Sequence, residues 1–260
     1  MRVASALILA PAAIAATWAG GGWFLVLIAL AASLMAIEWG LMSAPAAPNR
    51  ISVAVGVALL AAIFATFGGY VSLALVLLVF SAVAAALFAR RMGVGAIDAA
   101  YGVLYLGWPL ILIIWLRGTE SGFGFVVLLF AVVWASDSLA YVVGNILKGP
   151  KLWPRFSPNK TWSGFFGGLA AGMIAGALSA WWLDLGAVTP LWGAMLGLAA
   201  AGATMAGDLW ESALKRRYGV KDAGALIPGH GGLLDRVDGL MFAVVVVAGA
   251  RVFLIATGQG

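Results

Sequence analysis

The sequence has no cysteine, one histidine and few charged residues. Without cysteine there can be no disulfide, no thiolate nucleophile and no cysteine-ligated metal. Only 10% of the 260 residues are charged, whereas soluble domains have roughly 25%. By contrast, 64% of the residues are hydrophobic and the mean hydropathy is +1.07. A soluble protein of this size could not bury so much apolar surface, so the composition predicts a membrane protein.

The apolar residues gather in long runs that predict helices. Runs of about 17–25 apolar residues span a bilayer as helices, whereas barrel strands would be about 9–11 residues of alternating character. We therefore expect an all-α, polytopic integral membrane protein with two polar loops, at about 145–162 and 208–238. The nine expected spans lie at about 4–18, 22–42, 51–67, 70–89, 98–116, 123–144, 163–183, 189–207 and 239–257.

The spans predict one domain with a defined orientation. We expect a single membrane-embedded domain over 1–260, with scaffold helices at about 1–97 and a part at about 98–260 that holds both polar loops. With the N-terminus inside, the fifteen Lys and Arg residues divide into thirteen on the cytoplasmic side, Arg117 outside and Arg251 within the last span. This imbalance predicts that the N-terminus and both polar loops are cytoplasmic. No soluble basic domain remains that could bind nucleic acid.

The segment 208–238 is the most polar stretch of the chain. It holds ten of the 25 charged residues (15 basic plus 10 acidic) and the only histidine, His230. At its start, four polar side chains are spaced i, i+3, i+4 and i+7, which places them on one face of a helix: Asp208, Glu211, Ser212 and Lys215. Gly219 predicts the end of that helix. A glycine-rich loop around His230 then leads to Asp235 and the last span.

These residue types suit phosphates and a divalent cation. Carboxylates and hydroxyls are hard oxygen ligands for Mg²⁺, which proteins hold through one or two carboxylates plus substrate phosphates. Lysine and arginine neutralise phosphate oxygens, and glycines let backbone N–H groups approach an anion. Structural roles stay open for three residues. Arg217 could anchor the helix end at lipid headgroups, His230 could bond to backbone, and Asp238 could cap the last helix.

A second polar region precedes the segment 208–238. Asp137 lies late in an apolar span, where it could be a metal ligand or an ion-pair partner of Lys160 or Lys215. Thr161 is expected to cap a helix that starts at Trp162, which places Lys160 beside a helix N-terminus, a combination that favours anions. Two other acids have structural interpretations. We expect Glu38 to be buried and hydrogen-bonded, and Asp98 to cap a span.

Both polar segments resemble those of one enzyme family. The C-terminal segment is similar to the signature of phosphatidate cytidylyltransferases, also called CDP-diacylglycerol synthases, through Ser212, Lys215, Arg216, Lys221, Asp222, Leu226, Pro228, His230, Gly231, Gly232, Asp235, Arg236 and Asp238. The segments 137–144 and 157–164 resemble the family's second polar region. This chain departs there at Leu139, Asn145, Asn159 and Ser163, where the family usually has glycine, arginine, lysine and glutamate.

The resemblance implies an enzyme of a bacterial inner membrane that uses CTP and phosphatidate to form CDP-diacylglycerol and pyrophosphate. The lipid phosphate would attack the α-phosphorus of CTP with the help of Mg²⁺ or another divalent cation, and a second cation stays open. We hypothesise that Asp208 and Asp235 hold the metal, with Asp137 as a further candidate. The residues expected to bind phosphate groups are Lys160, Lys215, Arg216, Lys221 and Arg236, while Ser212 would bond a phosphate or the metal, and Asp222 and His230 would position groups or move protons.

Two other functions compete with this interpretation. In a secondary transporter or channel, Asp137, Asp208 and Asp235 would line an ion path. Against it, the charges gather in two cytoplasmic segments, and no inverted repeat is apparent. In another CTP-dependent enzyme the acceptor would be a different lipid phosphate, which the polar segments cannot distinguish. The residues also leave open whether the chain acts as a monomer or a homodimer.

Overall fold

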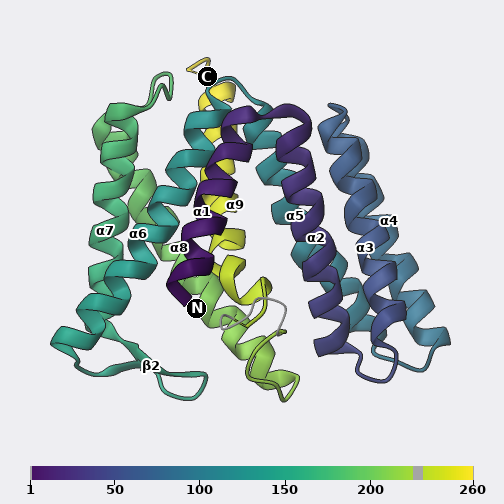
Figure 1. Ribbon diagram of the computed structural model, residues 1–260. Coiled ribbons are helices and arrows are strands. Elements are labelled where there is room, and N and C mark those ends of the chain that lie inside the picture. The colour runs from purple at the N-terminus through teal and green to yellow at the C-terminus, as the bar shows by residue number, and fades with distance from the viewer. Residues whose placement is uncertain (1, 225–230, 260) are drawn as a thin grey trace. The chain divides into compact units, whose positions relative to one another are not determined.

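The computed structural model describes residues 2–224 and 231–259 (Figure 1). Within these residues the chain forms nine α-helices and one short β-hairpin. The elements are α1 Arg2–Ala19, α2 Gly21–Ser43, α3 Pro48–Phe67, α4 Val71–Arg91, α5 Ala96–Gly118, α6 Gly122–Leu147, β1 Lys151–Trp153, β2 Ser157–Thr161, α7 Trp162–Trp182, α8 Pro190–Arg217 and α9 Leu234–Ala256.

Seven of the helices, α2 to α7 and α9, are long and apolar enough to cross a membrane. This confirms the expectation of an all-α, polytopic integral membrane protein. In α1 the described apolar part is shorter, Ala10–Ala19. The helix α8 is not among these seven; its first half is rich in glycine and alanine, and it runs on without a break into the polar residues up to Arg217. The last helix begins at Leu234, five residues before the start predicted from hydropathy.

The described helices group into two compact units. Unit 1 comprises Met1–Gly118 and Arg217–Val237, and unit 2 comprises Thr119–Arg216 and Asp238–Gly260. The C-terminal polar segment therefore contributes to both: its helical stripe belongs to unit 2, and the loop that follows belongs to unit 1. The expectation of one domain, with two parts that meet near residue 97, stays a prediction.

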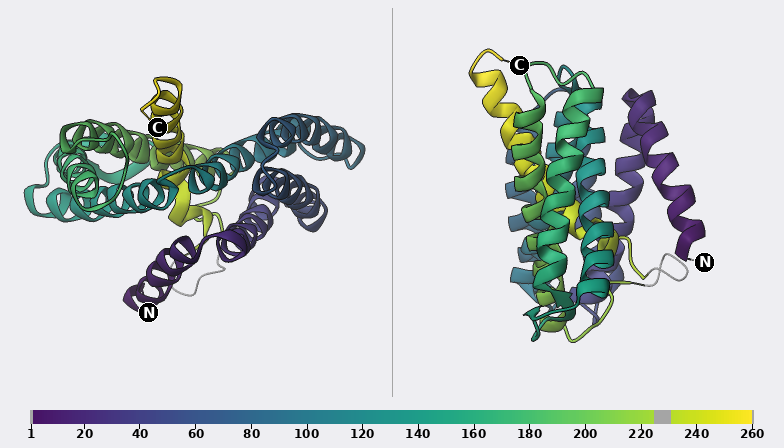
Figure 2. Two further views of the ribbon diagram at one scale, coloured as in Figure 1. Left: turned by 90° about the horizontal axis from the view of Figure 1, so that it is seen from above. Right: turned by 90° about the vertical axis from the view of Figure 1, so that its left-hand side faces the viewer.

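In unit 1, α2 packs against α3 and α5, and α4 packs against α3 and α5 (Figure 2). The packing centres on Trp39 of α2, which is fully buried. Its indole ring lies directly over Gly102 of α5, where any side chain would overlap it. The indole Nε1 donates to the backbone oxygen of Asp98 at 3.1 Å. This contact fixes the end of α2 that carries Glu38 against the start of α5.

In unit 2, α6 packs along α7, and α7 packs on α8 through glycines. A Cβ added at Gly176 would overlap the carbonyl oxygen of Gly193, and one added at Gly197 would overlap that of Gly172. The two backbones therefore touch with no side chain between them, which is how small residues allow close packing of membrane helices. Between α8 and α9, a Cβ added at Gly239 would overlap the side-chain methyl of Thr204.

The loop between α6 and α7 forms the hairpin of β1 and β2. Lys151 pairs with Thr161 and Trp153 with Ser157 in an antiparallel arrangement. The sequence predicted a polar loop here, and the structure adds the strand pairing. At its end the Thr161 hydroxyl accepts the Gly164 N–H at 3.2 Å, which confirms the predicted cap of α7. The hairpin is thus tied to the first turn of α7.

Candidate active site

The polar stripe of α8 forms as the spacing predicted. Asp208, Glu211, Ser212 and Lys215 all lie within α8, which ends at Arg217. Gly219 follows with a φ of +73°, a left-handed conformation that stops a helix and suits glycine. The Lys215 ammonium lies 3.2 Å from Oε1 of Glu211, whose side chain is fully buried. Glu211, to which the sequence gave no role, therefore supplies the counter-charge for Lys215.

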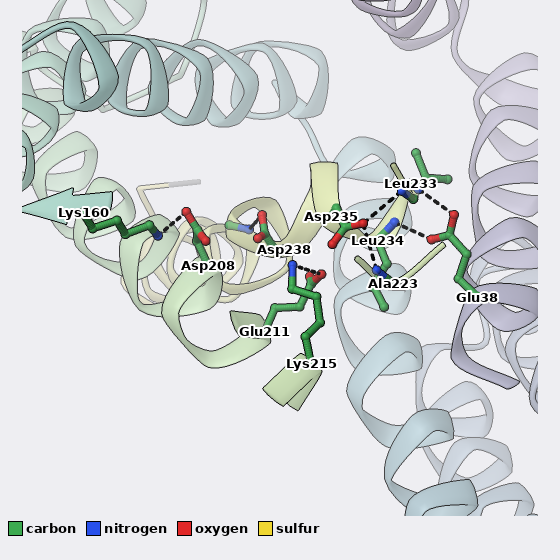
Figure 3. Close-up of polar contacts among 12 residues, drawn as sticks. Glu38, Lys160, Asp208, Glu211, Lys215, Ala223, Leu233, Leu234, Asp235 and Asp238 are labelled. Carbon is green, nitrogen blue, oxygen red and sulfur yellow. Dashed lines mark hydrogen bonds and ion pairs between the residues drawn. The ribbon is translucent and has the colours of Figure 1, made fainter. Parts of the chain in front are cut away.

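Lys160 of β2 forms an ion pair with Oδ2 of Asp208 (Figure 3). About a quarter of the lysine side chain and a third of the aspartate side chain are exposed, at 27% and 35%. The two residues come from the two polar segments that the sequence separated by almost fifty positions. Their pairing shows that the hairpin and the α8 stripe form one charged cluster within unit 2.

Asp238 of α9 joins this cluster. The negative charges of Asp208 and Asp137 act on its carboxyl group, and the positive charge of Lys215 opposes them. Its Oδ1 accepts the Gly239 N–H at 2.7 Å. The suggestion that Asp238 caps the last helix is wrong, because α9 already begins at Leu234. Asp137 is exposed on α6, and its role as a metal ligand or an ion-pair partner stays a prediction.

Asp235 lies in the first turn of α9, within unit 1. Its Oδ2 accepts two backbone hydrogen bonds, from Ala223 N–H at 3.0 Å and from Gly232 N–H at 2.9 Å (Figure 3). These bonds join the two described ends of the glycine-rich loop. Asp235 therefore organises the loop, in addition to the metal role predicted from the sequence.

Glu38 contacts the same loop, which the sequence did not predict. Its side chain is fully buried, as expected. Oε1 accepts the Leu233 N–H and Oε2 accepts the Leu234 N–H, both at 2.7 Å (Figure 3). A helical residue almost two hundred positions away thus caps the start of α9. No local pattern signals such a contact, although a lone acid in an apolar span was a reason to look.

Asp98 and Arg217 form a contact that the sequence did not predict. The carboxylate of Asp98 accepts from the Arg217 guanidinium and from the Tyr218 hydroxyl, each at 2.8 Å. Asp98 thus ties the end of α8 to α5, in addition to lying in the first turn of α5. Arg217 is held by this ion pair, whereas the sequence favoured an anchor at lipid headgroups. Burial, followed by the hydrogen bond and negative charge of Asp98, raises the pKa of Tyr218, which keeps its hydroxyl a donor.

The remaining candidates differ in exposure. Ser212 is half-buried on α8, whereas four charged side chains of the signature are exposed: Arg216, Lys221, Asp222 and Arg236. His230 lies outside the described residues. Ser163, at a position where the family usually has glutamate, donates instead to the Lys148 carbonyl. It therefore closes the hairpin and does not supply a charge.

The carboxylates of unit 2 suit a divalent cation. Among the described residues, no three acidic or histidine side chains converge closely enough to hold a metal ion by themselves. Mg²⁺ needs only one or two carboxylates, because substrate phosphates and water complete its coordination. Asp208 and the neighbouring Asp238 offer two such hard-oxygen ligands, already balanced by the ammonium groups of Lys160 and Lys215. The chemistry of this cluster therefore fits the expected cation.

Comparisons with known proteins agree with this chemistry. Residues 1–254 match the model of the Cytidylyltransferase family. A phosphatidate cytidylyltransferase of Brucella abortus biovar 1 (strain 9-941) is 50% identical over 150 residues, which cover 57% of this chain and 54% of that protein. One of Staphylococcus aureus (strain COL) is 40% identical over 149 residues, or 56% of each protein. One of Staphylococcus epidermidis is 37% identical over 164 residues, or 62% of this chain and 60% of that protein. The matched stretch thus spans little more than half the length of these relatives.

Proposed function

Since the chain belongs to the cytidylyltransferase family, we propose that it transfers the cytidylyl group of CTP to phosphatidate. The products would be CDP-diacylglycerol and pyrophosphate. The proposal is supported by relatives named phosphatidate cytidylyltransferase that are 50% and 40% identical to this chain over 150 and 149 residues. The observation that carries it is the ion pair of Lys160 and Asp208, which joins the side chain that we assign to phosphate binding to the one that we assign to metal binding.

The proposed reaction needs no covalent nucleophile. The phosphate of phosphatidate is already anionic at neutral pH, so one of its oxygens can attack the α-phosphorus of CTP directly. That bond forms as the bond from the α-phosphorus to the bridging oxygen breaks, and pyrophosphate leaves. The enzyme's task is to screen the repulsion between the two anions and to hold attack and departure in line. A chain without cysteine can perform this task with charge alone.

The described residues divide this task between them. Lys160, in β2 just before α7, would bind the lipid phosphate, and Lys215 would neutralise the triphosphate. Four exposed or half-buried residues of the signature would add to that charge or bond a phosphate: Arg216, Lys221, Arg236 and Ser212. Mg²⁺ or another divalent cation, when bound, would stabilise charge developing on the phosphate oxygens. We propose Asp208, with Asp238 beside it, and Asp235 as its ligands, with Asp137 and a second cation as further candidates.

The orientation follows from the substrate. CTP is cytosolic, so we propose that the N-terminus and both polar segments face the cytoplasm of a bacterial inner membrane. The orientation can be tested by thiol labelling, because the chain has no cysteine. A single cysteine introduced by Lys151→Cys or by Glu120→Cys would be the only thiol of that variant. In intact inverted vesicles, a membrane-impermeant maleimide should label Lys151→Cys and leave Glu120→Cys unlabelled. The reverse pattern would contradict the orientation.

One assay tests the proposed reaction. Purified protein in detergent is incubated with CTP, Mg²⁺ and a panel of lipid phosphates, and pyrophosphate release is followed. We expect release with phosphatidate and none without lipid. Preference for a polyprenyl or single-chain lipid phosphate would change the acceptor within the same chemistry. If no lipid phosphate supports release, the enzyme assignment fails and the transporter interpretation gains support. Light scattering of the same sample would distinguish a monomer from a homodimer.

A further inference from the structure

We propose that Glu38 of α2 is a positioning residue, which holds the start of α9 and thereby the signature carboxylate Asp235 in place. The inference rests on the proposed function, because that function gives Asp235 its task. Glu38 touches neither CTP nor lipid in this proposal. It acts through the backbone of Leu233 and Leu234, which it binds with both carboxylate oxygens at 2.7 Å.

The N-terminus of α9 needs such a partner. The first N–H groups of a helix have no acceptor within the helix, and a buried N–H left without a partner is costly. Glu38 satisfies two of them, and its negative charge lies at the positive end of the helix dipole. The carboxylate in turn needs these bonds, because its side chain is fully buried and a buried charge is tolerated only when hydrogen-bonded or paired.

The contact extends directly to Asp235. Gly232 donates its N–H to Asp235, while a Cβ on Gly232 would lie 2.8 Å from Oε2 of Glu38. A Cβ on Gly224, at the other described end of the loop, would lie 2.8 Å from Cγ of Glu38. Consecutive peptide groups are thus divided between the two acids: residue 232 binds Asp235, and residues 233 and 234 bind Glu38. A shift of the Glu38 carboxylate must therefore shift the support of Asp235.

Replacing Glu38 by glutamine removes the negative charge and keeps the size of the side chain. Glutamine has one acceptor oxygen and one donor NH₂ group, so it can accept only one of the two N–H groups and must oppose the other. Glu38→Gln should therefore loosen the start of α9 without changing side-chain size. Misplacing a functional group by about 1 Å can cost on the order of 10²-fold in rate. We expect kcat to fall roughly 10- to 100-fold, together with a higher Mg²⁺ concentration for half-maximal turnover.

Hydrogen–deuterium exchange measures the contact without relying on activity. In peptides covering 231–237, Glu38→Gln should exchange on the order of tenfold faster than the parent protein, because a buried hydrogen bond to a charged acceptor is lost. Glu120→Gln, which removes an exposed carboxylate, should change neither exchange in 231–237 nor turnover. Gly232→Ala keeps Glu38 but pushes against its carboxylate, so it tests the same contact from the loop if Glu38→Gln fails to fold.

The outcomes separate this inference from the proposed function. Unchanged exchange in 231–237 would overturn the Glu38 contact whatever the enzyme does. Faster exchange with an unchanged kcat and Mg²⁺ dependence would make Glu38 a structural residue only and overturn the positioning role. If the parent protein forms no CDP-diacylglycerol, the proposed function fails, and with it the task given to Asp235. The positioning role requires faster exchange, lower kcat and a shifted Mg²⁺ dependence in the same variant.

Discussion

Glu38 in unit 1 and Asp208 in unit 2 are both helical carboxylates, but they are held in different ways. Glu38 is fully buried and accepts two backbone N–H groups. Asp208 is about one-third exposed and pairs with the flexible side chain of Lys160. Backbone donors cannot leave without unfolding the loop, whereas an ammonium group can swing to another anion. The difference separates a carboxylate that fixes structure from one that can exchange its partner for a ligand.

Asp235 shares properties with both: it accepts backbone N–H groups as Glu38 does, and we assign it to metal binding as we do Asp208. Both of its backbone hydrogen bonds, from Ala223 and Gly232, end on the same oxygen, Oδ2. Glu38 instead uses one oxygen for each N–H group. The same acid-to-amide change should therefore have different structural effects at the two positions, and this difference can be measured.

The largest effect is expected for Asp208→Asn. The change removes the negative charge that we assign to metal binding, and several kcal/mol of charge stabilisation correspond to a rate loss of about 10³-fold. Turnover is measured with labelled CTP and phosphatidate. Asp184→Asn is a matched control, because it removes an exposed carboxylate from the loop before α8, and α8 begins about 27 Å along the helix from Asp208. Near-parental turnover of Asp208→Asn would refute its role as a ligand.

Asp235→Asn should come next, with a loss of roughly 10²-fold or more. The amide oxygen can still accept both N–H groups that now bind Oδ2, so exchange in 231–237 should stay unchanged. Loss of rate would then report the missing charge alone. Should turnover persist, Asp235 only organises the loop, as its hydrogen bonds already do. Comparison with Glu38→Gln, which should accelerate exchange, tests whether the two acids differ as proposed.

Lys160→Ala should have a smaller effect, about tenfold, because one of several phosphate-binding charges is lost. The loss should appear mainly in the KM for phosphatidate, since Lys160 is assigned to the lipid phosphate. Lys160→Arg keeps the charge and should restore most of the rate. A change confined to the KM for CTP would reassign this lysine to the nucleotide.

Thr161→Val should have the smallest effect, and on stability. It removes the cap of α7 while keeping the side-chain shape, which costs about 1 kcal/mol and should lower the midpoint of thermal unfolding by about 2–4 °C. Because Lys160 immediately precedes this cap, a modest rise in the KM for phosphatidate is also expected. An unchanged midpoint would show that the hairpin holds the start of α7 without the cap.

The sequence predicted the membrane architecture and the α8 stripe because both depend on local periodicity. Apolar runs mark spans, the i, i+3, i+4, i+7 spacing marks one helix face, and Gly219 marks its end. Thr161 was recognised as a cap because a threonine directly before a helix is also a local signal. The glycine-rich loop and its acids were recognised only by chemistry and resemblance, which name residue types without placing them.

The contacts that organise the loop could not be predicted in this way. Glu38 reaches Leu233 and Leu234, and Asp98 reaches Arg217 and Tyr218, across more than a hundred positions of chain. Such pairs follow from how helices pack, and apolar helix faces look alike in sequence. Asp238 was misassigned because hydropathy placed the helix start at the first apolar run, whereas α9 begins a turn earlier among polar residues.

The glycine contact between α7 and α8 sets the register of the charged cluster. Lys160 lies in β2 immediately before α7, and Asp208 lies on α8 beyond Gly197, so the positions of both depend on the two helices that meet at Gly176 and Gly193. Touching backbones have no side chains that could repack to absorb a displacement. A slip by one helical turn would separate the two charges by about 5.4 Å. Residues deep in the apolar part of unit 2, which carry no charge themselves, thus determine whether the ion pair can form.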